Sequence, residues 1–195
     1  MDNTVREQIH RLLQEEDFNA VYDKSVNLVN ENPSDYEAFW WMGVSLTLMG
    51  KYSEAIKALH EALKHADNED EESIIMSSLA KKFILEKKFE RAIDYANVSL
   101  ELNPRNSEAI IMKSIAYVAT GRKSDSQKLL EENLSKLEHY ERAGAYALLR
   151  CKQQMLDSLR KAVEEEPYRK TIVLNDPEFR HYIRDKEFRK LLDLS

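Results

Sequence analysis

Few residues in this chain are of a type and spacing that could carry out chemistry. Five histidines are scattered through it: His10, His60, His65, His139 and His181. No two of them stand four residues apart, the spacing that would place two metal ligands on one face of a helix. The chain also lacks a glycine-rich loop of the kind that binds phosphate groups. We therefore expect no metal site, no cofactor and no enzymatic activity.

The remaining reactive groups have more ordinary interpretations. The single cysteine, Cys151, lies between Arg150 and Lys152, which would favour its thiolate form. No base or second thiol accompanies it, so an ordinary turn residue is the better interpretation. The acidic run at residues 164–166 is interpreted as a solvated helix end. We expect no catalytic residue at any of these positions.

The composition excludes several classes of protein. Hydrophobic residues make up 43% of the 195 and charged residues 33%, values typical of a folded chain rather than a disordered one. The net charge of −6 argues against nucleic acid or an anionic membrane as the main partner, because both attract basic surfaces. The longest uncharged run, residues 38–50, is shorter than the roughly 20 residues that span a bilayer. With one cysteine and no visible secretory signal, we expect a cytoplasmic location.

The elements that must position any functional residue follow a repeated pattern of large and small apolar residues. In the unit that starts at Tyr36, large residues occupy positions 4, 7, 11, 17 and 24 and small residues occupy positions 8, 20 and 27. The large residues are Phe39, Met42, Leu46, Tyr52 and Leu59, and the small ones are Gly43, Ala55 and Ala62. Comparable units start at residues 2, 73, 107 and 136, so successive starts differ by 34, 37, 34 and 29 residues. Such spacing is typical of stacked helix pairs that bury an apolar stripe against their neighbours.

This pattern resembles the tetratricopeptide repeat, whose unit of about 34 residues is a helix, a turn and a second helix. The resemblance implies an all-α, right-handed superhelical solenoid of about five helix pairs over residues 1–167. The repeats lie near residues 2–35, 36–69, 73–106, 107–134 and 136–167, and a helical capping segment follows at 168–195. The fourth repeat is degenerate, so we expect its second helix, from Lys123, to be short and the least stable part of the array.

The segment at 168–195 contains a short internal repeat. Asp176-Pro177-Glu178-Phe179-Arg180 is followed nine residues later by Asp185-Lys186-Glu187-Phe188-Arg189. Each aspartate is expected to cap a short helix. Covering the last apolar face of the solenoid is the expected role of this segment. In the alternative interpretation, the segment folds back into the groove and fills it.

The resemblance also points to a binding surface. In the family, the first helix of each pair lines a concave groove, with positions 2, 5, 9 and 12 facing inward. Carried onto this chain, these positions give an apolar surface that suits a peptide or helix with apolar anchors. The candidate partner-binding residues are Trp40, Val44, Lys81, Ile111, Ile115 and Tyr140. The leading hypothesis is a non-enzymatic adaptor that binds a peptide or helical segment of a partner protein in this groove.

Two further expectations concern partners. In the alternative hypothesis, the groove is filled by the chain's own C-terminal segment and the protein is a structural repeat protein that self-associates as a homo-oligomer. Family members that bind the C-terminal carboxylate of heat-shock chaperones use lysine, asparagine and arginine at set positions of three successive repeats. Counted from the first repeat, this chain has at those positions Arg6, His10, Trp41, Ile74 and Ser78. These side chains do not supply converging cationic donors, so we expect no binding of the heat-shock chaperone carboxylate.

Overall fold

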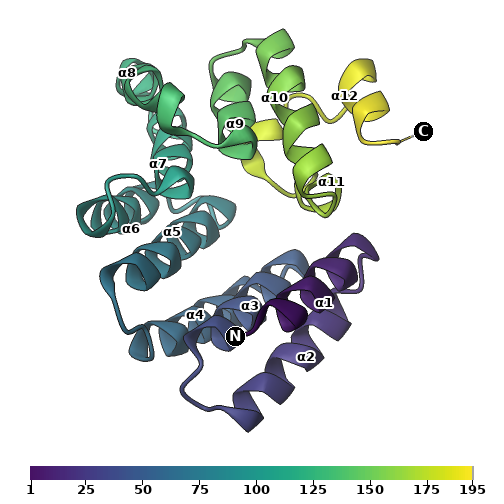
Figure 1. Ribbon diagram of the computed structural model, residues 1–195. Coiled ribbons are helices and arrows are strands. Elements are labelled where there is room, and N and C mark those ends of the chain that lie inside the picture. The colour runs from purple at the N-terminus through teal and green to yellow at the C-terminus, as the bar shows by residue number, and fades with distance from the viewer. Residues whose placement is uncertain (195) are drawn as a thin grey trace.

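The structure is a computed structural model that describes residues 1–194, and it consists of helices joined by short turns (Figure 1). Five helix pairs follow one another: α1 (Asn3–Gln14) with α2 (Phe18–Glu31), α3 (Tyr36–Leu48) with α4 (Tyr52–Lys64), α5 (Glu69–Leu85) with α6 (Phe89–Leu102), α7 (Ser107–Ala119) with α8 (Lys123–Asn133), and α9 (His139–Leu148) with α10 (Lys152–Glu165). One short element, η1 (Leu134–Lys136), lies between α8 and α9. Three more follow the last pair: α11 (Arg169–Ile172), η2 (Pro177–Phe179) and α12 (Lys186–Leu191). No β-strand occurs in residues 1–194, so the predicted all-α class is confirmed.

The two helices of each pair lie side by side, and each pair packs against the next (Figure 1). Small residues allow this close approach, and Ala55, Ala62 and Ala92 are fully buried. A Cβ atom added at Gly43 would lie 2.9 Å from Cγ of Leu59, so glycine lets α3 approach α4 at this point. The small positions of the sequence pattern therefore mark the places where helices touch.

Each pair turns between its two helices through a residue with positive φ. These residues are Glu16, Gly50, Lys87, Gly121 and Arg150, with φ of 58°, 74°, 60°, 83° and 62°. In the register expected from the sequence, all five stand at position 15. A left-handed residue at a helix end allows the last carbonyl groups of that helix to accept hydrogen bonds from the turn. Glycine adopts this conformation without strain, and the other three residues adopt it at a modest cost.

The fourth pair has the smallest second helix of the array. α8 has 11 residues, whereas α2, α4, α6 and α10 have 13 or 14. Only Ser126 and Leu130 of α8 are buried. The short length agrees with the degenerate sequence of this repeat. Within residues 1–194, no helix combines the length and the apolar character needed to cross a membrane.

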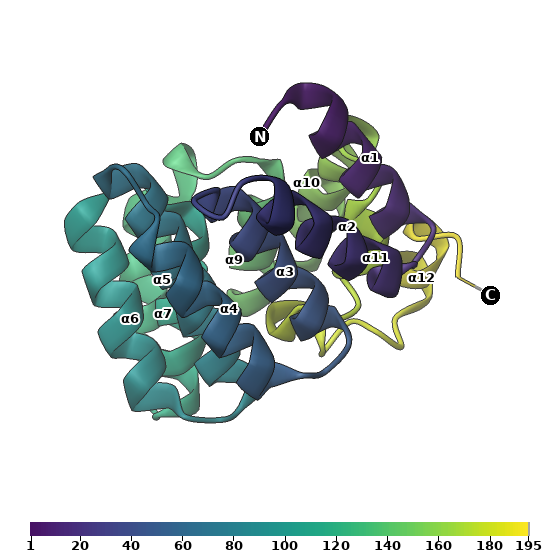
Figure 2. The same cartoon turned by 90° about the horizontal axis from the view of Figure 1, so that it is seen from below.

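The C-terminal segment, residues 168–194, packs against both ends of the array (Figures 1 and 2). On one side, Val173, Phe179 and Phe188 are fully buried in a core shared with α9 and α10. On the other side, Tyr168 joins the core of α1 and α2, and its ring stacks on His10 with a centroid distance of 4.5 Å. The superhelix is therefore closed into a ring by its own C-terminal segment.

Candidate functional site

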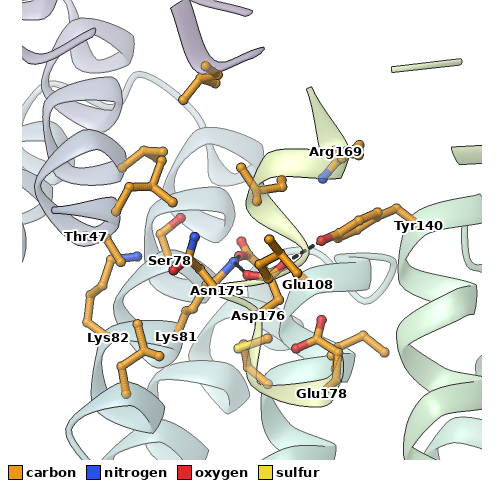
Figure 3. A pocket seen from close by; sticks show the side chains of 18 of the residues that line it. Thr47, Ser78, Lys81, Lys82, Glu108, Tyr140, Arg169, Asn175, Asp176 and Glu178 are labelled. Atoms are coloured by element: carbon orange, nitrogen blue, oxygen red, sulfur yellow. Dashed lines mark hydrogen bonds and ion pairs between the residues drawn. The ribbon is translucent and has the colours of Figure 1, made fainter. Parts of the chain in front are cut away.

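A carboxylate of the C-terminal segment reaches the concave surface of the array (Figure 3). Oδ1 of Asp176 lies 2.6 Å from Nζ of Lys81 on α5, and the Tyr140 hydroxyl on α9 donates a hydrogen bond of 2.6 Å to Oδ2. Nζ of Lys81 is also 3.8 Å from Oε1 of Glu108 on α7. Burial alone would lower the pKa of Lys81, but the charges of Asp176 and Glu108 outweigh burial and raise it above its ordinary value. Three inner helices are thus joined to the C-terminal segment through one buried cluster.

The position of Asp176 corrects the expectation that this residue caps a short helix. Asp185, its equivalent in the second copy of the internal repeat, does cap α12, and its side chain accepts hydrogen bonds from the backbone N–H groups of Glu187 and Phe188. Asp176 precedes η2 but accepts no capping hydrogen bond. Its carboxylate instead contacts a lysine and a tyrosine away from solvent, where charge-assisted hydrogen bonds are strong. Tertiary contacts, and not the local sequence, decide between the two roles.

Glu178 is the second buried acid of this segment. It is 8% exposed, and its Oε2 atom has no hydrogen-bond partner in the described residues. A Cβ atom added at Gly144 would lie 3.3 Å from the Glu178 side chain, so the glycine of α9 makes room for this acid. Burial, reinforced by the charge of Asp176, raises the pKa of Glu178 to about 8. The Glu178 carboxyl group is therefore mostly protonated at neutral pH, which avoids two adjacent negative charges in a buried site.

A cavity of about 430 Å³ lies between the C-terminal segment and the first helices of the five pairs. Five of the six candidate partner-binding residues line it: Trp40, Val44, Lys81, Ile111 and Tyr140. The sixth, Ile115, does not line it and packs against the apolar core of α5, α6 and α7. The C-terminal segment supplies the wall that faces α3 and α5. The cavity is therefore the part of the concave surface that the C-terminal segment walls on one side.

The five lining residues differ in how much of their surface is free. Ile111 is 1% exposed and Tyr140 is 7% exposed, so both belong mainly to the walls. Trp40 and Val44 are half-buried. The Trp40 indole N–H donates a hydrogen bond of 2.9 Å to Oγ of Ser78, which fixes the ring at the cavity edge. Trp40 and Val44 therefore offer the apolar surface that a ligand in the cavity can reach.

Lys82 also lines the cavity, and the sequence reasoning missed it. It is 3% exposed, and its side-chain amine forms no hydrogen bond or ion pair with residues 1–194. Burial, and then the charge of Lys81, lower the pKa of Lys82 to about 7. In the repeat register Lys82 stands at position 10, which is not an inward-facing position, so the spacing gave no reason to select it. The one signal was a pair of adjacent lysines in an apolar stretch of helix.

His10, His65 and the cysteine take part in packing contacts. His10 stacks on Tyr168, and His65 stacks on Phe39 with a centroid distance of 5.5 Å. Cys151 is half-buried, and its Sγ atom lies 3.7 Å from the backbone oxygen of Leu149. Across residues 1–194, no group of three histidine, cysteine, aspartate or glutamate side chains is arranged to hold a metal ion.

The helix pairs, their shared turn and the concave surface define an all-α superhelical repeat protein. The crystal structure of TTC0263, a thermophilic TPR protein of Thermus thermophilus, is similar with a TM-score of 0.60 and 16% identity, over 86% of this chain and 98% of that one. MamA of Desulfovibrio magneticus has a TM-score of 0.54 and 15% identity, over 84% of this chain and 94% of that one. The predicted resemblance is confirmed, and this chain has the fold of tetratricopeptide repeat proteins.

The relatives found by sequence match only part of this chain or only part of their own length. The photosystem I assembly protein Ycf3 of Rippkaea orientalis is 28% identical over 117 residues, which are 59% of this chain and 68% of that protein. The DnaJ homolog subfamily C member 3 homolog of Dictyostelium discoideum is 26% identical over 191 residues. That match covers 88% of this chain but spans only 36% of the Dictyostelium protein. No protein-family model matches the chain.

Proposed function

We propose that this protein is a non-enzymatic interaction module that holds a short segment of a partner protein in the cavity between Trp40 and the C-terminal segment. The observation that carries the proposal is the cavity itself, whose walls combine apolar side chains with a few polar groups. Its volume of about 430 Å³ suits a few residues of a peptide better than a whole helix.

In this proposal the C-terminal segment stays in place and forms one wall of the cavity. Phe179 and Phe188 are fully buried, and burying one such side chain contributes roughly 1.5–3 kcal/mol to stability. Displacing the segment would lose both contributions, so a partner is expected to bind beside it and not in its place. This narrows the expected contacts to Trp40, Val44 and Lys81, with Ile111 and Tyr140 behind them.

The relatives and the charge agree with a protein partner. The Rippkaea orientalis relative is named as an assembly protein of photosystem I, and a role in the assembly or holding of other proteins is what we propose for this chain. The net charge of −6 favours a protein partner over nucleic acid. A single, half-buried cysteine agrees with a location in the reducing cytoplasm.

A structural role is the second candidate, and the contact between Asp176 and Lys81 favours it. In this case the C-terminal segment fills the groove only to complete the fold. Partners or further copies of the chain then bind to the outer helices. Val98 on the outer helix α6 is 38% exposed, so it is a suitable position for testing the outer surface.

Matched substitutions on the two surfaces separate these candidates. Val44→Arg places a long charged side chain in the cavity, and Val98→Arg makes the same change on α6 as a control. If the cavity binds the partner, a protein that co-purifies with the tagged wild-type chain is lost with Val44→Arg and retained with Val98→Arg. Thermal unfolding of both variants checks that the fold is intact. Loss with Val98→Arg alone, together with a changed sedimentation coefficient, would support the structural candidate instead.

Trp40→Ala is a less specific test than Val44→Arg. Trp40 packs in the apolar clusters of both the first and the second helix pairs, and it donates a hydrogen bond to Ser78. Its removal would lower stability as well as binding, since truncating a large aromatic side chain leaves a void. The two effects would then have to be separated before any loss of binding is interpreted.

A further inference from the structure

Two neighbouring lysines of α5 have opposite surroundings. Lys81 is paired with Asp176 at 2.6 Å and with Glu108 at 3.8 Å. Lys82 is 3% exposed, and its side-chain amine forms neither a hydrogen bond nor an ion pair with any described residue. In Figure 3, Lys81 points toward Asp176, whereas the Lys82 side chain extends on the side of Thr47. The amine of Lys82 thus lines the cavity without a partner of its own.

An unpaired buried amine is unfavourable when it carries its charge. Removing an ammonium group from water costs several kcal/mol unless an opposite charge or several hydrogen bonds compensate for it. The nearest opposite charges, Asp176 and Glu108, are already engaged by Lys81. The positive charge of Lys81 adds repulsion, and burial with this repulsion brings the pKa of Lys82 close to neutral pH. An anion that enters the cavity could therefore form a charge-assisted hydrogen bond with the Lys82 amine, which has no such bond within the protein.

The surroundings of Lys82 restrict the kind of anion. The cavity that Lys82 lines also has apolar residues in its walls, which include Val44, Leu48 and Leu85. A phosphate group carries up to two charges and needs several cationic donors, but Lys81 and Arg169 are already paired with acids, and the remaining cation of the lining, Arg180, is exposed to solvent. One buried amine without an ion pair, in a cavity that also offers apolar side chains, fits a single negative charge on an apolar carrier. A carboxylate has that charge and can accept hydrogen bonds from one ammonium group.

We propose that Lys82 is the anchor for the carboxylate of an aspartate or glutamate side chain, flanked by apolar residues, in the bound segment of the partner. This inference rests on the proposed function and specifies the chemistry of the partner at the same site. The C-terminal segment shows the same type of contact, because its Asp176 pairs with Lys81 and is followed closely by the buried Phe179. Lys82 provides an equivalent contact for a second chain.

A small carboxylic acid and its own amide test this contact directly. The probes are 3-phenylpropionate and 3-phenylpropanamide, which share their apolar part and differ in charge. Trp40 and Trp41 both line the cavity, so tryptophan fluorescence of the full chain reports binding. At neutral pH and low salt, the acid is expected to bind the wild-type protein at least about tenfold more tightly than the amide.

The variants are Lys82→Met and, as a matched control, Lys57→Met at an exposed position of α4. Lys57→Met is expected to keep the preference for the acid, and Lys82→Met is expected to lose it. The proposal is overturned if the acid and the amide bind equally to the wild-type protein, if neither binds, or if Lys82→Met retains the preference. Thermal unfolding of each variant shows that the comparison is made on folded protein.

The same variant separates this inference from the proposed function. If Lys82→Met still captures the partner while Val44→Arg does not, the cavity binds the partner but Lys82 is not its anchor. If both variants lose the partner while Lys57→Met and Val98→Arg keep it, both statements are supported. If Val44→Arg keeps the partner, the proposed function fails, whatever the probes show.

Discussion

The carboxylate of Asp176 lies 2.6 Å from Nζ of Lys81, which joins the C-terminal segment to the third helix pair. The same segment packs on the last pair through Phe179 and on the first pair through Tyr168. In an ordinary solenoid each repeat touches only its neighbours. Here the first, third and last pairs share one segment, so the array is expected to unfold more cooperatively than an open one.

The contact between Asp176 and Lys81 predicts a specific loss of stability. Asp176→Asn leaves Lys81, whose side chain is 20% exposed, without its closest opposite charge. We expect a loss of about 2–3 kcal/mol in the free energy of unfolding, measured with urea. The matched change Asp185→Asn alters the other copy of the internal repeat and is expected to cost less than about 1 kcal/mol, because asparagine also caps helices. Equal losses for the two variants would contradict a role for the buried pair.

Glu178 predicts that stability falls as the pH rises. Its folded-state pKa of about 8 lies above the ordinary value of 4.5, so the unfolded chain releases a proton that the folded chain retains. This contribution to stability is full below about pH 4.5 and is lost as the pH rises toward 8. Glu178→Gln is expected to change little near pH 4.5 and to stabilise the protein by roughly 2–4 kcal/mol near pH 8. Glu187→Gln, at the equivalent exposed position, is the control and should show no such gain in urea denaturation.

Lys82 predicts the opposite pH dependence, in which stability rises as the pH rises above neutral. Its folded-state pKa of about 7 lies below the ordinary value of 10.5. The stability contribution is therefore full above about pH 10.5 and is lost as the pH falls toward 7. Lys82→Met is expected to raise the unfolding free energy at neutral pH by roughly 1–3 kcal/mol, and the gain should shrink as the solution becomes alkaline. A variant less stable than wild type at neutral pH, with Lys57→Met unchanged, would show that the Lys82 amine has a stabilising partner.

Much of the fold could be predicted from the sequence because it depends on local spacing. The turn residues, such as Gly50 and Gly121, stand at one position of every repeat, and a helix pair requires its turn there. Small residues such as Ala55 and Ala92 also recur where helices touch. Inward-facing positions follow from the same register, and Trp40, which the register places on the inner face of α3, lines the cavity.

The parts that could not be predicted depend on contacts between distant residues. Asp176 and Asp185 stand in nearly the same local sequence, yet one faces Lys81 and the other caps α12. No spacing rule distinguishes them, because the difference is made by what lies opposite each residue in space. Lys82 was missed for a related reason, since it stands at a position of the repeat that is not inward-facing and its burial depends on tertiary packing. Ile115 was selected by register alone, and it is partly buried against the core of α5, α6 and α7 instead of lining the cavity.

His10 predicts a loss of stability in acid. It stacks on Tyr168, and burial is the main cause that lowers its pKa below the ordinary value of 6.5. The unfolded chain therefore takes up a proton more readily, and the stability that is present above pH 6.5 is lost as the pH falls. His10→Phe keeps a ring for stacking and is expected to reduce this acid sensitivity in thermal unfolding. His60→Phe, at an exposed position of α4, serves as the control and should leave the acid dependence unchanged.

The two ends of the C-terminal segment are expected to protect opposite ends of the array. Phe188 is fully buried in the core of α9 and α10, whereas Tyr168 belongs to the core of α1 and α2. Phe188→Ala should cost about 3–5 kcal/mol locally, because truncating a buried aromatic side chain leaves a cavity. Hydrogen exchange should then increase mainly in α9 and α10. Tyr168→Ala should increase exchange mainly in α1 and α2, because repeats open locally according to the contacts that each one loses. If either substitution raised exchange only at the end that it does not contact, the closed ring would not describe the protein in solution.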